Sequence, residues 1–382
     1  MAVVADLLEE RWPSMDLMAD MLMTHTGANG SAFTPALIRP EFGSALPSVM
    51  RRDEGEPPPT IQRIAHRFWS YPRWLRQQPA ADVYHIVDHS YAHLAHVLPA
   101  ERVVVTCHDI DAFRTLLPGG QRESTLPRAF VKRALTGLQR AAAVVCDSEA
   151  TRSELLANSL VSADRTSVVP IAVHPSCTVA PDAAADAVAA TLTGPLGASD
   201  LLHVGSTIPR KRIEMLLEVL ARVADRRPDV RLWRVGGPFT DAQAARACQL
   251  GVAQRITVMP FVTRPVLAAL YRRAALVVLP SEREGFGLPV IEAMACGTPI
   301  VCSDLPVLRE VGGGAAEYCA PGDPAEWSTR IVALLTERAS ARTRWGARQA
   351  AGIARASRFS WHRYASEMHA VYEWVSEAAP CR

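Results

Sequence analysis

Short runs of β-branched residues alternate with longer helical patterns along nearly the whole chain, and this alternation constrains the fold more than any other feature. In the first half, strands are predicted near residues 2–5, 37–39, 83–86, 103–107, 143–146 and 167–170. In the second half, they are predicted near residues 201–205, 230–235, 256–259, 276–280, 300–302 and 318. Strands that are joined by helices pair in parallel, so the pattern predicts an α/β protein with parallel sheets.

The length of 382 residues suits two such sheets, at roughly 100–200 residues per domain. An Ala-, Asp- and Gly-rich stretch with little β signal, residues 179–199, separates the two series and predicts a linker. We therefore expect a first domain over 1–178 and a second over 200–358. Ligands of open parallel sheets bind outside the carboxyl ends of the strands, so the chemistry is expected in a cleft between the domains.

Charge and composition exclude several classes of protein. Forty-one basic and thirty-nine acidic residues give a net charge of +2, which provides no strong field for nucleic acid. The longest apolar runs, such as 274–280, fall far short of the ~20 residues of a membrane span. Acidic residues at 6, 9 and 10 lie where a signal peptide would be basic, so a cytoplasmic location is expected. The eight cysteines show no C-x-x-C pair and no zinc spacing.

The segment with the richest chemistry spans residues 280–299 and reads PSEREGFGLPVIEAMACGTP. A strand ends, a loop with Gly285 and Gly287 follows, and a helix then begins. The open backbone of this loop and the helix N-terminus favour an anionic diphosphate. Glu284 and Glu292 would repel a phosphate unless they bind hydroxyls. The segment therefore predicts a site for a sugar-bearing nucleotide.

A second segment, residues 203–212, reads HVGSTIPRKR. Its strand ends near Gly205, and Arg210 and Lys211 are expected to open the next helix. Cations at that position oppose the helix dipole, which favours an anionic partner beside them. The chain has only one other lysine, Lys132. The segment predicts a phosphate site.

A third segment, residues 103–110, brings His108 and Asp109 to the carboxyl end of a strand. A lone histidine is more often structural than catalytic, so these residues alone assign no role to His108. His89 and His93 are four residues apart and could bind a metal from one helix face. No third ligand is evident, so acceptor contacts or helix packing are the better interpretation of this pair.

Taken together, these segments resemble the retaining glycosyltransferases of family 4, which have the GT-B fold of two facing Rossmann-like domains. The resemblance is dense over 200–325 and sparser before 180, where Asp147 and Ser148 also fit. The matching residues are Glu284 and Glu292 of the E-x7-E motif, Arg210 and Lys211 of the R-K pair, and residues 106–109 of the T-x-H-D step.

The resemblance implies roles for individual residues. Glu284 would contact the hydroxyls of the donor sugar, and Glu292 would hold the ribose hydroxyls. Arg210 and Lys211 would neutralise the departing diphosphate, and His108 would lie near the reactive carbon and 6-hydroxyl of the sugar. The expected catalytic residues are His108, Arg210, Lys211 and Glu284, and the expected donor-binding residues are Gly205, Arg210, Lys211, Glu284, Gly285, Phe286, Gly287, Leu288 and Glu292.

The activity implied is transfer of a hexosyl or related sugar from a nucleoside-diphosphate sugar to an acceptor hydroxyl, with retention of configuration. No carboxylate is placed as a nucleophile, so same-face attack is expected, with the leaving phosphate taking the proton. The cations would do the work of a metal, so no metal or other cofactor is expected. The alternatives are a nucleotide-sugar epimerase or a phosphorylase of the same fold, or a catalytically silent sugar-nucleotide binding subunit.

The acceptor side departs from the family. Where family members often carry a glycine pair after the first strand, residues 7–14 read LLEERWPS. Trp12, His89 and Asp109 are the expected acceptor-side residues, for a saccharide, lipid-linked or small-molecule acceptor. The aromatic C-terminal helix within residues 359–382 is expected to cross back to the first domain, as it does in the family.

Residues 61–76 interleave arginines with large aromatic side chains. Such a stretch suits peripheral contact with an anionic membrane on its inner face. The alternative is an amphipathic helix that packs its rings on the first sheet, and Pro72 interrupts a continuous face. The residues expected at a membrane are Arg63, Arg67, Trp69, Arg73 and Trp74.

Overall fold

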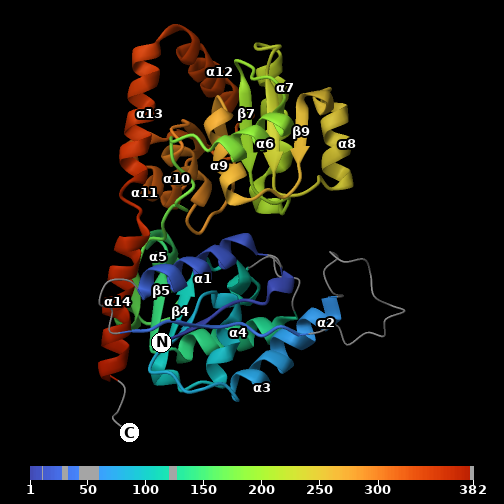
Figure 1. Ribbon diagram of the computed structural model, residues 1–382. Coiled ribbons are helices and arrows are strands. Elements are labelled where there is room, and N and C mark those ends of the chain that lie inside the picture. Colours follow the sequence, from blue (N-terminus) through green and yellow to red (C-terminus); the bar gives the residue numbers. More distant parts are fainter. Residues whose placement is uncertain (11, 28–32, 43–59, 120–126, 379–382) are drawn as a thin grey trace. The chain divides into compact units, whose positions relative to one another are not determined.

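A computed structural model describes residues 1–10, 12–27, 33–42, 60–119 and 127–378. The chain forms two compact units: unit 1 comprises residues 1–171 and 361–382, and unit 2 comprises residues 172–360 (Figure 1). Each unit is built on one six-stranded sheet in which every strand pairs in parallel. The structure confirms the predicted α/β class with two Rossmann-like domains.

The sheet of unit 1 has the strand order β2-β1-β3-β4-β5-β6. All six predicted strands are present, and their ends differ from the expected ones by at most two residues. Chain order reverses between β1 and β3, which creates the switch point where ligands of such sheets bind. The strands are β1 (Ala2–Val4), β2 (Ala36–Ile38), β3 (Tyr84–Ile86), β4 (Val103–Cys107), β5 (Ala143–Cys146) and β6 (Thr166–Val168).

Both faces of this sheet are covered. Val4, Ile86 and Val105 point to one face, where they share a buried cluster with Leu138 of α4. His85 and Thr106, one position along their strands, point to the opposite face because side chains alternate along a strand. The helices of unit 1 are α1 (Pro13–Thr26), α2 (Thr60–Ala65), α3 (Tyr71–Leu75), α4 (Arg128–Arg140), α5 (Glu149–Ala157) and α14 (Trp361–Ala378).

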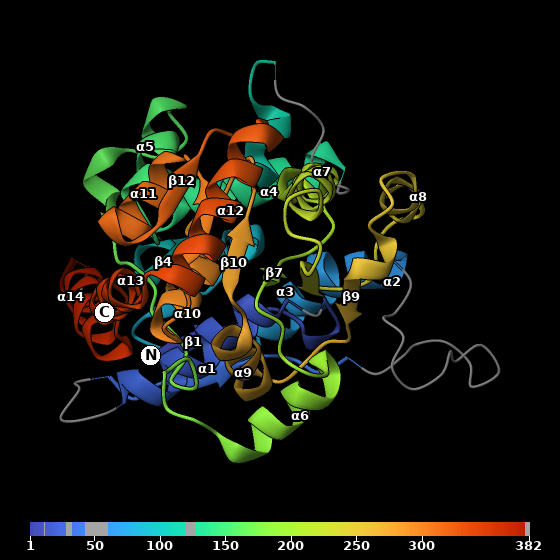
Figure 2. The same cartoon turned by 90° about the horizontal axis from the view of Figure 1, so that it is seen from above.

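The sheet of unit 2 has the order β12-β11-β10-β7-β8-β9, so its switch point lies between β7 and β10. Helices flank this sheet, as Figures 1 and 2 show. Trp327 of α12 is fully buried in a hydrophobic cluster to which α7, α12 and the sheet all contribute. The strands are β7 (Asp200–Val204), β8 (Arg231–Val235), β9 (Ile256–Met259), β10 (Leu276–Leu279), β11 (Ile300–Ser303) and β12 (Glu317–Cys319). The helices are α6 (Ala183–Thr193), α7 (Ile213–Ala224), α8 (Asp241–Gln249), α9 (Arg264–Arg273), α10 (Leu288–Ala295), α11 (Pro306–Gly312), α12 (Pro324–Ser340) and α13 (Arg342–Ala356).

Residues 179–199, expected to be a linker, contain helix α6. Asp182 caps this helix by accepting a hydrogen bond from the backbone of Ala185 at 3.1 Å. Its alanines are the best helix formers, so their abundance marked a helix rather than a bare connection. Asp186 of α6 forms an ion pair with Arg272 of α9 at 2.7 Å, which makes α6 a packed part of unit 2.

The C-terminal helix α14 packs in unit 1, where it contacts α1 and β4 (Figure 1). Tyr372 of α14 is fully buried, and its hydroxyl lies 2.7 Å from Nδ1 of His85 on β3. The other ring nitrogen of His85 lies 2.7 Å from the hydroxyl of Thr106 on β4. Burial, and secondly the charge of His108, lower the pKa of His85 to about 3, so this ring is a neutral link between helix and sheet.

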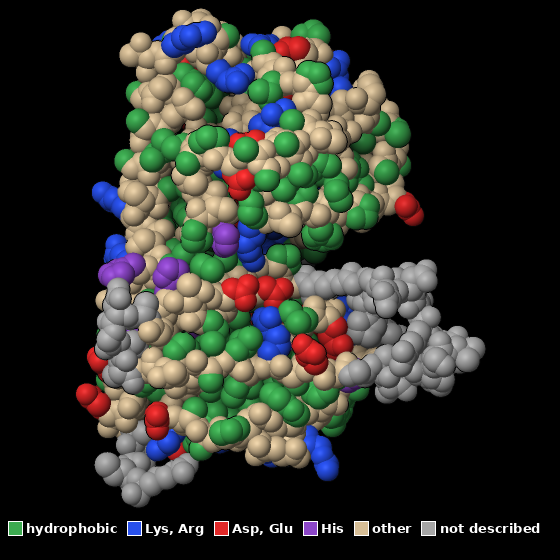
Figure 3. Space-filling model, in the orientation of Figure 1, with side chains coloured by type: hydrophobic (Ala, Val, Ile, Leu, Met, Phe, Trp, Pro, Cys, Tyr) green, Lys and Arg blue, Asp and Glu red, His purple; other side chains and the backbone are tan. Residues whose placement is uncertain are grey.

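Two properties of the described residues are relevant to contact with nucleic acid and with membranes: the distribution of surface charge and the length and apolar character of the helices. On the face that Figure 3 shows, acidic and basic side chains are interspersed, as the small net charge suggests. Within the described ranges, no helix combines the length and the apolar character that a membrane crossing requires.

The packing of α14 predicts a large difference between two aromatic residues on the same helix. Replacing buried Tyr372 by alanine should lower the free energy of unfolding by about 3–5 kcal/mol, because it leaves a cavity and strips His85 of a partner. Trp374 is 47% exposed, and its alanine variant should lose less than about 1 kcal/mol. Urea unfolding of both variants tests this, and equal losses would contradict the packing described.

Candidate functional site

In unit 2, the switch point of the sheet brings two loops together. Strand β7 pairs in parallel with β10, so the loops that follow these strands leave the same edge of the sheet side by side. The first loop carries Arg210 and Lys211, and the second carries Glu284. Nζ of Lys211 lies 2.6 Å from the Glu284 carboxylate, and Nη1 of Arg210 lies 3.4 Å from it. Residues 73 and 74 positions apart in sequence thus form one ion-pair cluster.

The carboxylate of this cluster is almost closed to solvent. The Glu284 side chain is 7% exposed, and it also accepts a 2.6 Å hydrogen bond from the hydroxyl of Ser281. Burial by itself would raise the pKa of Glu284, but the charges of Lys211 and Arg210 outweigh burial and hold it below its ordinary value. Glu284 is therefore an ionised hydrogen-bond acceptor at neutral pH.

The sequence around Arg210 and Lys211 places them ahead of the helix. They lie in a short 3-10 turn, Pro209–Lys211, and Arg212 then adopts a left-handed conformation with φ 52° before α7 begins. The expectation that these cations open the helix is wrong, because the left-handed residue separates the turn from α7. A 2.7 Å backbone bond from Glu282 to the carbonyl of Arg210 ties this turn to the second loop.

The second loop needs glycine at Gly287. This residue has φ 93°, precedes α10, and a Cβ there would lie 2.5 Å from the side chain of Leu308. Gly285 and Phe286 are buried, and the Phe286 ring packs edge-on against Phe359 at 5.7 Å. The Phe286 side chain is therefore core. Leu288 begins α10 directly after this loop.

Glu292 lies on α10, about one turn from its start, and is 7% exposed. Its carboxylate accepts a 2.8 Å hydrogen bond from the hydroxyl of Tyr271 on α9. Burial raises the pKa of Glu292, and the Tyr271 bond opposes that rise. Sequence reasoning missed Tyr271, since it lies outside every recognisable motif and only the packing of α9 against α10 reveals it. Gly205 is half-buried directly after β7.

In unit 1, His108 follows β4 and has an acceptor at each ring nitrogen. Nδ1 lies 2.5 Å from the carboxylate of Asp147, and Nε2 lies 2.7 Å from the carbonyl of Val87. Because both partners accept, both nitrogens carry protons, and the ring is an imidazolium. Burial would lower the pKa of His108, but the charge of Asp147 outweighs it and raises the pKa to about 9.

Asp147 had no role in the sequence analysis, although a signal for it was present. It directly follows β5, the strand beside β4, so it leaves the same sheet edge as His108. Its side chain is 1% exposed. Parallel neighbours deliver the residues after their carboxyl ends to one place, which is why two separate strand ends form this pair.

The expected acceptor-side residues fall into two groups. Nε2 of His89 lies 3.7 Å from the Asp109 carboxylate, and Nδ1 of His89 accepts from the backbone N–H of His108 at 3.4 Å. These three residues therefore lie together in unit 1. Trp12 is 55% exposed immediately before α1. His93 instead bonds the carbonyl of Arg67 at 2.8 Å, and no group of metal-ligating side chains occurs within the described ranges.

The stretch expected at a membrane is partly buried. Arg67 is 8% exposed, forms an ion pair with Glu10 at 3.2 Å, and lies over the Tyr91 ring at 4.2 Å. Its inclusion among membrane-facing residues is wrong, because the guanidinium is committed to partners inside unit 1. Arg63 and Trp74 are half-buried, and Trp69 and Arg73 are exposed.

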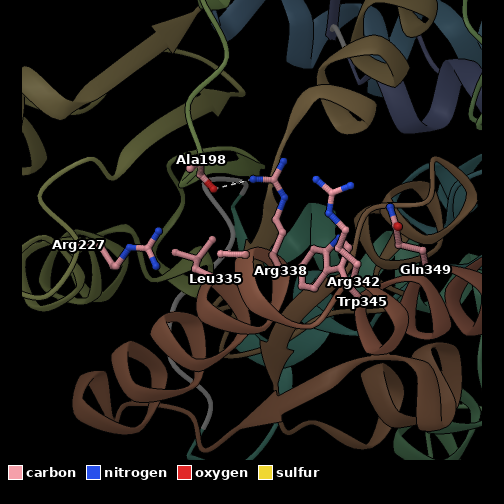
Figure 4. A pocket seen from close by; sticks show the side chains of 8 residues that line it. Ala198, Arg227, Leu335, Arg338, Arg342, Trp345 and Gln349 are labelled. Atoms are coloured by element: carbon pink, nitrogen blue, oxygen red, sulfur yellow. Dashed lines mark hydrogen bonds between the residues drawn. The ribbon is translucent and has the colours of Figure 1, made fainter.

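A pocket of about 470 Å³ lies elsewhere in unit 2 (Figure 4). Arg338 donates to the carbonyl of Ala198 at 2.6 Å across it. Ala198 precedes β7, so the pocket is at the amino end of that strand, and the ion-pair cluster is at the other end. Its lining residues are Ala198, Arg227, Leu335, Arg338, Ala339, Arg342, Trp345 and Gln349.

Comparison with known families matches most of the chain in two parts. Residues 31–176 match the model described as "Glycosyltransferase Family 4", and residues 198–337 match the model described as "Glycosyl transferases group 1". Among curated proteins, the D-inositol 3-phosphate glycosyltransferase of Segniliparus rotundus is 39% identical over 44% of this chain and 38% of its own length. The enzyme of the same name from Thermobispora bispora is 33% identical over 47% of this chain and 44% of its own length. The chain thus spans less than half the length of these relatives.

Solved structures share the fold at low sequence identity. Sucrose-phosphate synthase from Thermosynechococcus elongatus superposes with a TM-score of 0.75 at 19% identity, covering 99% of both chains. Anabaena Alr3699/HepE, solved in complex with UDP and glucose, gives 0.71 at 15% identity, covering 97% of this chain and 99% of its own.

The His108–Asp147 pair predicts a pH dependence. Since the pKa of His108 is raised to about 9, the pair stabilises the folded chain below the ordinary value of 6.5, and this stability is lost as pH rises through 9. Replacing Asp147 by asparagine should lower the pKa of His108 by about 1–3 pH units and remove this pH dependence. NMR titration of the ring tests this, with the fully exposed Asp164→Asn variant as control; an unchanged pKa in Asp147→Asn would refute the pairing.

Proposed function

Because the chain belongs to glycosyltransferase family 4, we propose that it transfers a sugar from a nucleoside-diphosphate sugar to an acceptor hydroxyl, with retention of anomeric configuration. The observation that carries the proposal is the cluster of Lys211, Arg210 and Glu284 at the switch point of the unit 2 sheet. Two cations beside a buried carboxylate suit a ligand that has a diphosphate next to a hydroxyl-rich sugar.

Arg210 and Lys211 act on the leaving group. Breaking the bond to the sugar places negative charge on the diphosphate, and fixed cations stabilise that charge without reorganising during the reaction. The Arg210 fork suits two phosphate oxygens, and Lys211 supplies a compact charge. Both now face Glu284, so the bound diphosphate would share them with this carboxylate.

Glu284 and Glu292 act on hydroxyls of the donor. Glu284 is held ionised by its cations, so it accepts hydrogen bonds from the sugar. Glu292, oriented by Tyr271, accepts from the ribose. The backbone of Gly205, Gly285, Phe286, Gly287 and Leu288 completes the donor site.

His108 is assigned to the sugar site without a role as catalytic base. An imidazolium that already donates from both nitrogens cannot take a proton from the acceptor. We assign it a place beside the reactive carbon and the 6-hydroxyl of the sugar, where the Asp147 and Val87 bonds hold the ring in a fixed orientation. The leaving phosphate then takes the proton of the acceptor on the same face of the sugar, which gives retention.

The acceptor site is assigned to His89, Asp109 and Trp12 of unit 1. The curated relatives are named for inositol phosphate; for this chain we propose a hydroxyl-bearing saccharide, lipid-linked or small-molecule acceptor. An epimerase or phosphorylase would convert the donor without an acceptor, and a silent subunit would bind the donor without turnover.

A thermal-shift screen against nucleoside-diphosphate sugars, followed by an acceptor panel with the stabilising donor, tests the function. Binding raises the melting temperature by mass action. We expect one donor to stabilise the chain and to be consumed only with an acceptor present. No stabilising donor, or rapid conversion of the donor alone, would reject the proposal.

The leaving-group role predicts the effect of Lys211→Ala. Turnover should fall about 100-fold or more, whereas donor affinity should fall far less, because the charge develops in the transition state. Lys132→Ala removes the only other lysine, which is exposed on α4, and should leave both quantities unchanged. Steady-state kinetics and donor titration separate the two, and equal losses in both would contradict the role.

A further inference from the structure

Strand β8 carries a buried arginine that lacks an acidic partner. Arg234 is fully buried, and within the described part of the chain no carboxylate forms an ion pair with it. Its guanidinium instead donates to two carbonyls, that of Gly205 at 3.2 Å and that of Gly237. On the same strand, Arg231 has the ordinary arrangement, an ion pair with Asp200 at 2.7 Å.

The two carbonyls belong to loops at the carboxyl edge of the sheet. Gly205 opens the loop that leads to Arg210 and Lys211, and Gly237 lies in the loop after β8. These loops touch: Gly236 has φ 129°, and a Cβ there would lie 2.0 Å from the carbonyl oxygen of Gly205. Through these two hydrogen bonds, Arg234 connects the loop of Arg210 and Lys211 to the loop that follows β8.

The neighbouring histidine leaves this charge uncompensated. His203 on β7 is fully buried, and neither of its ring nitrogens has a hydrogen-bond partner among the residues that the structure describes. Burial, followed by the charges of Arg234 and Lys211, lowers the pKa of His203 to about 3, so the ring is neutral. Burial also lowers the pKa of Arg234 to about 10, which still leaves the guanidinium charged at neutral pH.

A buried charge without a counter-ion is costly, and an anion bound nearby would relieve that cost. The loop of Arg210 and Lys211 lies beside this arrangement, and both cations pair with Glu284. A diphosphate bound at this loop would supply the counter-charge that Arg234 lacks.

We propose that Arg234 is a positioning residue for the donor diphosphate. Its hydrogen bond to the carbonyl of Gly205 holds the loop of Arg210 and Lys211, and its guanidinium, which has no counter-ion among the described residues, adds positive charge to the anion site. This inference rests on the proposed function, because it names the phosphate-binding machinery of the same site. Arg234 acts through the loop and needs no contact with the ligand.

Calorimetric titration of the full chain with pyrophosphate, with UDP, GDP and ADP, and with the matching nucleosides tests the proposal. Arg234→Met should weaken binding of pyrophosphate and of the preferred nucleotide about tenfold, while nucleoside affinity changes less than about twofold. Arg234→Lys, which keeps the charge, should fall between this variant and the wild type. Arg246→Met removes an arginine that pairs with Glu218 on the surface, and it should match the wild type.

The outcomes separate this inference from the proposed function. Unchanged pyrophosphate affinity in Arg234→Met, or an equal loss for nucleotide and nucleoside, overturns the role of Arg234. Failure of the wild type to bind any nucleotide rejects the proposed function, and pyrophosphate then still tests the anion site; failure to bind pyrophosphate as well rejects both.

Hydrogen exchange of the wild type provides a second measurement that does not depend on the folding of a variant. Bound pyrophosphate should slow amide exchange in residues 205–211 and also in residues 236–239, because Arg234 joins the two loops. Protection confined to residues 205–211 would overturn the proposal.

Discussion

Parallel pairing of β10 with β7 is the constraint on which the donor-side chemistry depends. Chain order reverses between these strands, so the loops after them leave one edge with no helix crossing between them. The loop after β7 carries Arg210 and Lys211, and the loop after β10 carries Glu284. A backbone bond from Glu282 to Arg210 then holds the loops together, so the ion pairs form between groups already in place.

Buried charges are compensated to different degrees in the two units. In unit 1, the charges of His108 and Asp147 neutralise each other, and both side chains are almost closed to solvent. In unit 2, Lys211 and Arg210 share the carboxylate of Glu284, and Arg234 forms no ion pair with a carboxylate among the described residues. A site with an excess of one charge is prepared for a ligand of the other, which is why we place the anion in unit 2.

Several residues could not be assigned from sequence because their environment depends on distant segments. Arg67 reads as a surface cation among aromatics, yet Glu10 and the Tyr91 ring, far away in the chain, enclose it. Tyr271 reads as one more apolar position of a helix, yet its hydroxyl orients Glu292. Arg234 is a charged residue within a predicted strand, and only the carbonyls of Gly205 and Gly237 explain its burial. Helix α6 is hard to predict for a simpler reason, because its alanine-rich sequence shows little strand signal and so resembles a linker.

The sequence by itself determined the strands and the motif residues. Short β-branched runs that alternate with helical patterns favour buried strands, so all twelve strands and the α/β class were predicted from local pattern. Short motifs, each continuous in sequence, likewise identified the candidate site residues Glu284, Glu292, Arg210, Lys211 and His108. Tertiary structure decided the partners of these groups: Asp147 for His108, Tyr271 for Glu292 and the cations for Glu284. The physical reason is that the charge state of a buried group depends on which groups surround it, and strand order brings those groups together from segments far apart in sequence.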